Sequence, residues 1–122
     1  MQRFPSRSAD AAPTVGMDMT PLIPPGTSIT SVEVDVEVWA SSPVPDPSPR
    51  STLSGPYELV NGVMLNGQLT DNVLLQRVSG GVIGCVYVLT FRANFANGDT
   101  DEEQVMQTVA RYVPPNGLAV TP

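Results

Sequence analysis

The chain of 122 residues contains no histidine and no lysine, and its only cysteine is Cys85. Without histidine, a serine or cysteine nucleophile lacks its usual general base, and without lysine no Schiff base can form. A single cysteine excludes an intrachain disulfide, and without histidine or further cysteines one chain cannot form a histidine or multi-cysteine zinc site. A phosphate-binding loop with its lysine is also missing. We therefore expect a protein that is not an enzyme and that holds no cofactor.

Charge is scarce, and most of it is negative. Charged residues make up 15% of the chain, against a usual share of about a quarter, and the net charge is −6. All six basic residues are arginines that form no basic run. Because a phosphate backbone repels an acidic protein, we expect no direct binding to nucleic acid. The hydrophobic share of 41% favours a folded core over a disordered chain.

Long apolar runs are absent as well. No stretch approaches the roughly 20 residues of a membrane-spanning helix, and the N-terminal MQRFPSRSADAAP has no apolar segment typical of a signal peptide. We therefore expect synthesis in a cytoplasm and no membrane partner. Cys85 lies inside the apolar run GVIGCVYVL, which favours a small buried side chain over a reactive thiol.

The strongest structural signal in the chain is the segment from Ser79 to Val113. Two β-rich runs flank Ala96-Asn97-Gly98-Asp99, and an Asn-Gly pair between such runs predicts a β-hairpin. One face of its first strand is predicted to collect apolar side chains: Ile83, Cys85, Tyr87, Leu89, Phe91, Ala93 and Phe95. Its second strand, residues 102–113, is predicted to place three valines on one face: Val105, Val109 and Val113.

Another strand is predicted from Ser28 to Ala40. Four valines alternate there with three carboxylates: Val32, Val34, Val36 and Val38 against Glu33, Asp35 and Glu37. This period of two places the valines on a buried face and the carboxylates, about 7 Å apart, on a face that meets solvent or arginine. The only tryptophan, Trp39, lies at the end of this strand, and packing in the core is its expected role.

Short strands and turns fill the middle of the chain. Residues 41–50 carry four prolines and predict an extended, exposed loop, whereas Tyr57–Leu69 predicts two short strands with turns at Asn-Gly pairs. A further strand is expected at Val73–Val78. Frequent turn signals without helical periodicity predict an all-β chain, an antiparallel β-sandwich. Tyr87 follows a glycine-rich turn, where its hydroxyl can bond to nearby backbone as a tyrosine corner does.

The chain divides into three regions on this basis. Residues 28–114 form the predicted sandwich, residues 115–122 a short C-terminal tail, and residues 1–27 an extended N-terminal arm with five prolines and no clear periodicity. Two interpretations of the arm stay open, because its apolar side chains need a surface to lie on. It either packs on its own domain or docks on a neighbouring subunit or partner.

Acidic residues crowd the tip of the predicted hairpin, from Asp99 to Glu103. Carboxylates at this density are the kind of ligand that calcium prefers. Their spacing, however, matches no calcium-binding loop, and charged hairpin tips usually serve solubility. We therefore expect a solvated end and no bound metal.

Two blocks of the chain combine turn and strand residues in a distinctive order. The first block is Asp18-Met19-Thr20-Pro21-Leu22-Ile23-Pro24-Pro25-Gly26-Thr27-Ser28-Ile29, leading into the valine-rich strand. The second is Ser79-Gly80-Gly81-Val82-Ile83-Gly84-Cys85-Val86-Tyr87, followed by Asn97-Gly98-Asp99 and Val109 to Val113. In these two blocks the chain resembles a family of small tailed-phage proteins encoded among the capsid and head-tail genes. The proline-rich loop and the middle strands have no counterpart in the resemblance. Trp39 also departs from it, because the family has a tryptophan near the start of the first strand.

The resemblance implies a virion structural protein with an immunoglobulin-like β-sandwich, on the outer surface of the capsid. The role it implies is that of a decoration or cement protein, which binds the major capsid protein and stabilises joints between coat subunits. It also implies a homo-oligomer, for which a trimer suits the role better than a dimer. The expected partner-binding residues lie in the arm and the tail: Phe4, Met17, Met19, Leu22, Ile23, Leu118 and Val120.

Two alternatives to this role stay open at the level of sequence. One is another part of the virion, either the base of a head fibre or an adaptor of the tail or connector. The other is a glycan- or receptor-binding module, for which Trp39, Tyr57 and Tyr112 are the candidate exposed aromatic residues.

Overall fold

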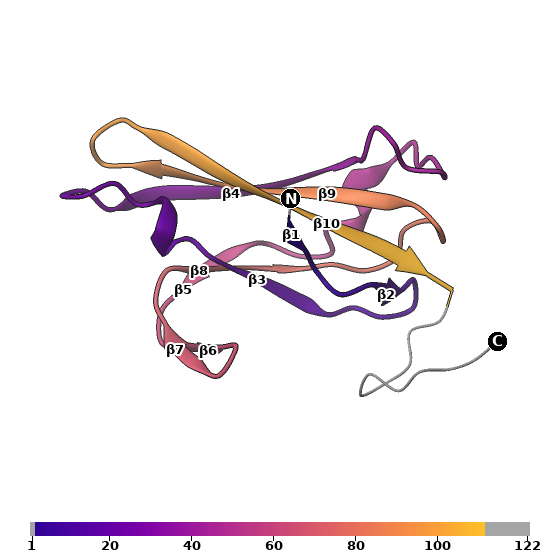
Figure 1. The fold of residues 1–122 in the computed structure, drawn as a ribbon, viewed down its shortest axis with the longest axis horizontal. Helices are drawn as coiled ribbons and strands as arrows, with labels where there is room; N and C mark the ends of the chain where they lie inside the picture. The colour runs from indigo at the N-terminus through magenta and orange to yellow at the C-terminus, as the bar shows by residue number, and fades with distance from the viewer. Residues whose placement is uncertain (1, 112–122) are drawn as a thin grey trace.

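The computed structural model describes residues 2–111 and consists of two packed β-sheets (Figure 1). In the first sheet, β10 pairs antiparallel with β9, and β9 pairs antiparallel with β4. The short strands β1 and β2 both pair parallel with the other edge of β10. The strands of this sheet are β1 (Gln2–Arg3), β2 (Arg7–Ser8), β4 (Ile29–Val38), β9 (Val86–Phe95) and β10 (Thr100–Ala110).

The second sheet has the order β3-β8-β5, and all its pairs are antiparallel. A separate two-stranded hairpin, β6–β7, is inserted between β5 and β8 and projects from this layer away from the first sheet (Figure 1). The remaining elements are β3 (Thr14–Asp18), β5 (Glu58–Val60), β6 (Val63–Leu65), β7 (Gln68–Thr70), β8 (Val73–Arg77) and the 3-10 helices η1 (Thr20–Leu22) and η2 (Pro49–Thr52).

The strand order is that of an immunoglobulin-type sandwich. In that fold, strands B, E and D form one sheet, and strands C, F and G form the other. The orders β3-β8-β5 and β4-β9-β10 reproduce both arrangements. The predicted all-β sandwich is therefore confirmed.

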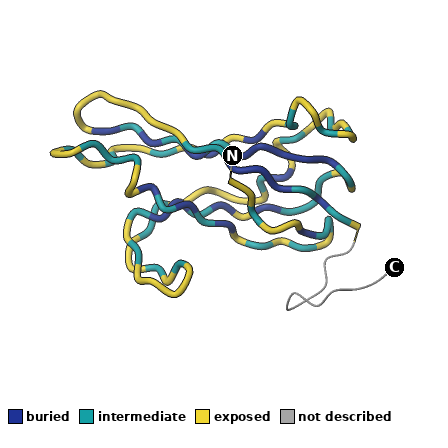
Figure 2. Tube along the Cα trace, in the orientation of Figure 1, coloured by how far each residue is buried: buried dark blue, intermediate teal, exposed yellow. Residues whose placement is uncertain are grey.

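The core lies between the inner faces of the two sheets (Figure 2). The predicted alternation in β4 is confirmed, because Val34 and Val36 are buried while Glu33, Asp35 and Glu37 are exposed. The inner side of β9 is the most deeply buried surface: Phe91 and Ala93 are fully buried, and Leu89 is 2% exposed. Val15, Met17 and Leu74 of the second sheet pack in the same cluster, and Val105 and Val109 lie beside this surface on the neighbouring strand β10.

The predicted hairpin is formed by β9 and β10, with its turn at residues 96–99 as expected. The predicted face is wrong at Ile83, which is 46% exposed. Gly80, Gly81 and Gly84 all have positive φ and form a turn, so the strand begins only at Val86. Val113 lies outside the described residues.

The N-terminal segment differs from the expected arm. It is extended, but it joins both sheets of its own sandwich through β1, β2 and β3. Pro5 and Pro13 lie between these strands, where a missing N–H costs no ladder bond. The alternation of Val15, Met17 and Met19 is the period-two pattern that was not recognised in the sequence. The sandwich therefore does not begin at residue 28.

The hydroxyl of Tyr87 ties two loops to the start of β9. It accepts a hydrogen bond from the Val82 N–H at 2.8 Å and donates one to Asp46 Oδ2 at 2.7 Å. The first bond is the predicted tyrosine corner. The second holds the proline-rich loop against the sandwich. Gly81 has a φ of +91°, and a Cβ there would lie 2.9 Å from the Tyr87 hydroxyl, so this close approach requires glycine.

Arg7 fastens the N-terminal segment at the same end of the sandwich. It is 5% exposed; its Nε donates to Gln107 Oε1 at 3.1 Å and its Nη1 donates to the Gly80 carbonyl at 2.8 Å. Gln107 in turn donates to the Pro5 carbonyl at 3.1 Å. Burial lowers the pKa of Arg7, but these acceptors compensate for the lost hydration of its charge.

Replacing Tyr87 with phenylalanine tests the hydroxyl as a structural tie. We expect Tyr87→Phe to lower the free energy of unfolding by about 1–3 kcal/mol, because the part-buried hydrogen bonds to the Val82 N–H and to the Asp46 carboxylate are both lost. Urea unfolding followed by circular dichroism measures the loss. The matched control is Tyr57→Phe at a side chain that is 43% exposed, with an expected change within about 0.5 kcal/mol. Equal effects of the two substitutions would contradict the assignment.

The same hydroxyl predicts a loss of stability in alkali. Burial is the main cause that raises the pKa of Tyr87 above its usual value of about 10. As the pH rises, the unfolded chain therefore loses this proton before the folded chain does. The contribution of Tyr87 to the free energy of unfolding is complete below about pH 10 and falls as the pH rises above that value. Unfolding free energies measured from pH 8 to 11 should decline less in Tyr87→Phe than in the wild type. Parallel curves would overturn the prediction.

Candidate interaction surfaces

The structure places the predicted partner-binding residues of the arm in or against the core of their own chain. Met19 is fully buried and Met17 is 8% exposed. Three others, Phe4, Leu22 and Ile23, are half-buried and pack against the same core cluster. The expectation that Met17 and Met19 contact a partner is therefore wrong, because a buried side chain offers no surface. Leu118 and Val120 lie outside the described residues.

Phe4 closes the edge of the core beside β1. Its ring meets the ring of Phe91 edge to face, with 6.0 Å between centroids and an interplanar angle of 86°. This geometry is favourable for an aromatic pair. Phe4 therefore belongs to the packing of its own sandwich rather than to a free arm.

The outer face of the first sheet is polar over half its length, with cross-strand pairs linking β4, β9 and β10. Arg92 bonds to Glu33 at 2.7 Å and to Glu102 at 3.3 Å, and Asn94 donates to Ser31 at 2.9 Å. The hydrogen bond to Glu33, followed by the charge of Glu102, raises the pKa of Arg92. These carboxylates are exposed, as the alternation in β4 predicted.

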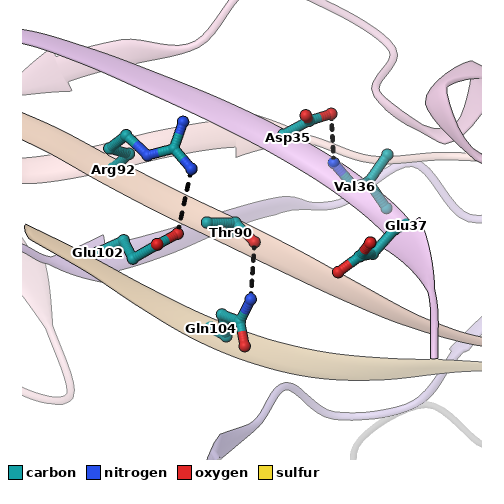
Figure 3. A pocket seen from close by; sticks show the side chains of 7 residues that line it. All are labelled: Asp35, Val36, Glu37, Thr90, Arg92, Glu102 and Gln104. Atoms are coloured by element: carbon teal, nitrogen blue, oxygen red, sulfur yellow. Dashed lines mark hydrogen bonds and ion pairs between the residues drawn. The ribbon is translucent and has the colours of Figure 1, made fainter. Parts of the chain in front are cut away.

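A shallow hollow of about 270 Å³ lies on this polar face (Figure 3). Its lining residues come from β4, β9 and β10: Asp35, Val36, Glu37, Thr90, Arg92, Glu102 and Gln104. Several polar groups are already occupied: Gln104 donates to Thr90 at 3.3 Å, and Asp35 pairs with Arg50 at 3.1 Å. The hollow is therefore a solvated surface with its charges largely matched.

The other half of this face is apolar and closed. Val86, Val88 and Met106 are 4–8% exposed, and Trp39 packs against them. Trp39 thus packs as expected, but on the outer side of the first sheet rather than between the sheets. Because this patch is covered within the chain, it offers no free apolar surface.

The acidic hairpin tip bonds to its own loop. Asn97 donates to Asp99 Oδ2 at 2.9 Å, and the Asp99 N–H donates back to Asn97 Oδ1 at 2.9 Å. Across residues 2–111, no group of three or more cysteine, aspartate or glutamate side chains is arranged to hold a metal ion. The tip residues are exposed over most of their length.

The hairpin β6–β7 carries an exposed apolar pair. Met64 and Leu69 lie directly opposite each other in the register and are 64% and 72% exposed. The turn between the strands has φ of 52° at Asn66 and 78° at Gly67, which is typical of a tight type I′ hairpin. The opposite face of the hairpin carries Leu65, which approaches the second sheet beside Gly16. The outer pair therefore stands on a hairpin with a tight turn whose inner face contacts the second sheet.

Sequence reasoning did not select Met64 and Leu69. The Asn66-Gly67 turn was recognised, but the residues of Val63–Leu65 are all apolar, so alternation could not tell an outer face from an inner one. The signal that could have indicated them is the apolar run Val63–Leu65 directly before the Asn66-Gly67 turn.

A groove of about 560 Å³ separates the N-terminal strand β1 from β3. All five residues of β3 line it, together with Phe4 from beyond β1 and Leu65 from the hairpin. Its walls are the edge strands of the two sheets.

Comparison of the chain with protein-family models, curated proteins and solved structures finds no match. Within residues 2–111, no helix is long and apolar enough to cross a membrane.

Alanine substitutions separate the buried methionine from the exposed one. We expect Met19→Ala to cost about 2–5 kcal/mol of unfolding free energy, because it leaves a cavity in the core. Met64→Ala removes the same atoms from an exposed site and should change stability by about 0.5 kcal/mol or less. Urea unfolding of both variants provides the measurement. A stable Met19→Ala protein would mean that this segment does not belong to the core.

Proposed function

We propose that the chain is a virion structural protein, a decoration protein that binds the outside of a phage head and stabilises joints between coat subunits. The sequence resemblance to small head-associated phage proteins suggests the role. The exposed Met64–Leu69 pair on the hairpin β6–β7 is the observation that carries the proposal, because it supplies an apolar contact on a projecting hairpin.

The hairpin suits a contact with a large, repeated partner. Apolar side chains that stay exposed in a folded domain mark interaction sites when they stand together. Burying the pair removes apolar area from water, and the type I′ turn and the anchored inner face mean that little order is lost on binding. A weak contact of this kind becomes effective when many copies cover one shell, or when the chain is multivalent.

The remaining surface agrees with a binding role. The outer face of the first sheet carries exposed carboxylates paired with Arg92 and Arg50. Such a face remains hydrated and keeps an outward-facing surface soluble. The partner implied by the proposal is the major capsid protein, and the location is the capsid surface.

Polar substitutions in the hairpin test the proposal. We expect Met64→Ser with Leu69→Ser to weaken binding to phage heads purified without this protein by at least about tenfold, measured by co-sedimentation. The melting temperature should stay unchanged, because both side chains are exposed.

The matched control is Ile83→Ser, which removes an apolar side chain that is 46% exposed in the turn between β8 and β9, away from the hairpin. This variant should bind heads as the wild type does. Undiminished binding by the hairpin variant would overturn the proposed contact. A small fixed number of copies per head, instead of a number in proportion to the coat subunits, would favour a connector or fibre role.

A further inference from the structure

One edge of β3 has no partner strand among residues 2–111. In immunoglobulin sandwiches, the first strand of the chain pairs with strand B, whose position β3 occupies here. The first strands of this chain, β1 and β2, pair with β10 in the other sheet instead. The place beside β3 where strand A would lie is therefore open in the described part of the chain.

The free edge presents backbone donors and acceptors. The Val78 N–H donates to the Pro13 carbonyl, and the Met19 N–H donates to the Asn72 carbonyl. Because bonded pairs alternate along an antiparallel ladder, Val15 and Met17 also bond toward β8. The N–H and C=O groups of the alternate residues point the other way, to the open edge: Thr14, Gly16 and Asp18.

The groove beside this edge has a mixed lining, in which Gln2, Arg3, Thr14, Asp18 and Asn66 lie beside apolar residues. Phe4, Val15, Met17 and Leu65 contribute apolar side chains, and Gly16 at the centre of β3 contributes none. An extended segment could lie there with its backbone paired to β3 and alternate side chains directed into the groove. Such a strand would complete the second sheet and cover an unprotected edge.

We propose that residues 112–122 of a second copy of the chain occupy this edge as an added strand. The segment YVPPNGLAVTP contains no charged residue, so it brings no charged side chain into the groove. After Pro115, the residues from Asn116 to Thr121 all retain their N–H groups, which is sufficient to pair with the five residues of β3. Leu118 and Val120 are two apart and project to the same face of a strand.

The length and origin of this segment favour exchange between copies. Residues 112–122 reach roughly 36 Å when extended, about twice the length of β3. They begin at the end of β10, beside β2, which pairs with Val109 and Ala110. Because β2 leads into β3, the start of β3 lies near the same point. A segment of the same chain would therefore enter the edge at the start of β3 and run parallel to it. The segment of another copy can approach from the opposite end and form the more stable antiparallel pair.

This arrangement gives every copy one donor segment and one acceptor edge. Contacts of this head-to-tail kind close into rings when the rotation between copies allows it. The inference concerns self-association and does not depend on the contact between the hairpin and the head.

Sedimentation of full-length variants without phage heads tests the inference. The wild type should sediment as an oligomer. Thr14→Pro removes an N–H from the open edge and should give a monomer, whereas Thr14→Val keeps that N–H and should remain oligomeric. Leu118→Glu with Val120→Glu changes only the donor segment and should also give a monomer, so the test does not depend on the folding of Thr14→Pro.

Mixing the two monomeric variants gives the sharpest outcome. Thr14→Pro retains a competent donor segment and the double glutamate variant retains an open edge, so together they should form a heterodimer. A monomeric wild type, or an oligomer that survives both changes, would overturn the inference. Loss of head binding in Thr14→Pro with an unchanged oligomeric state would assign the edge to the coat protein and would likewise overturn it.

Discussion

Burial of β9 between two neighbouring strands and under a second sheet is the constraint on which the rest of this structure depends. β9 pairs with β10 on one side and β4 on the other, so its backbone groups are satisfied within the first sheet. Its inner side chains are almost completely removed from water, with Phe91 fully buried. Covering this row requires apolar side chains from β3 and β8. The two-layer architecture follows, because neither sheet can bury its apolar face alone.

The route of the N-terminal segment is a consequence of the same requirement. Phe4 packs on Phe91 at the edge of the core, which places β1 beside β10, and the segment reaches the second sheet only at β3. Buried Arg7 and the Tyr87 hydroxyl then hold the turns where the chain changes sheets. This route seals the core beside β10 and leaves β3 without a second neighbour among residues 2–111. The pairing of the N-terminal strands with β10 therefore both closes the core and leaves the edge of β3 open.

The two proposed contacts differ in chemistry, so they can operate together. The hairpin β6–β7 offers the side chains of Met64 and Leu69, whose contribution to binding is apolar burial. The edge of β3 offers backbone groups, which recognise an extended segment of almost any sequence that fits the groove. Leu65 on the inner face of the hairpin also lines the groove, so the two surfaces are close but face different directions. A ring of copies joined through β3 would present several hairpins to one partner, and its affinity would rise with their number.

Local pattern was enough to predict much of the fold. The valines of β4, the turn at residues 96–99 and the corner role of Tyr87 each depend on neighbours close in sequence, and each is confirmed. The N-terminal segment was misinterpreted because its prolines mask a short alternation, and because a strand of two residues is stable only when a long partner such as β10 is already present.

The sequence by itself determined the all-β class and the acidic outer face, since period-two alternation sets which side of a strand meets water. Only the tertiary structure decided that Met17 and Met19 are core, that Met64 and Leu69 are surface, and that β3 has an open edge. Burial and pairing depend on which distant segments meet, and no local pattern specifies that.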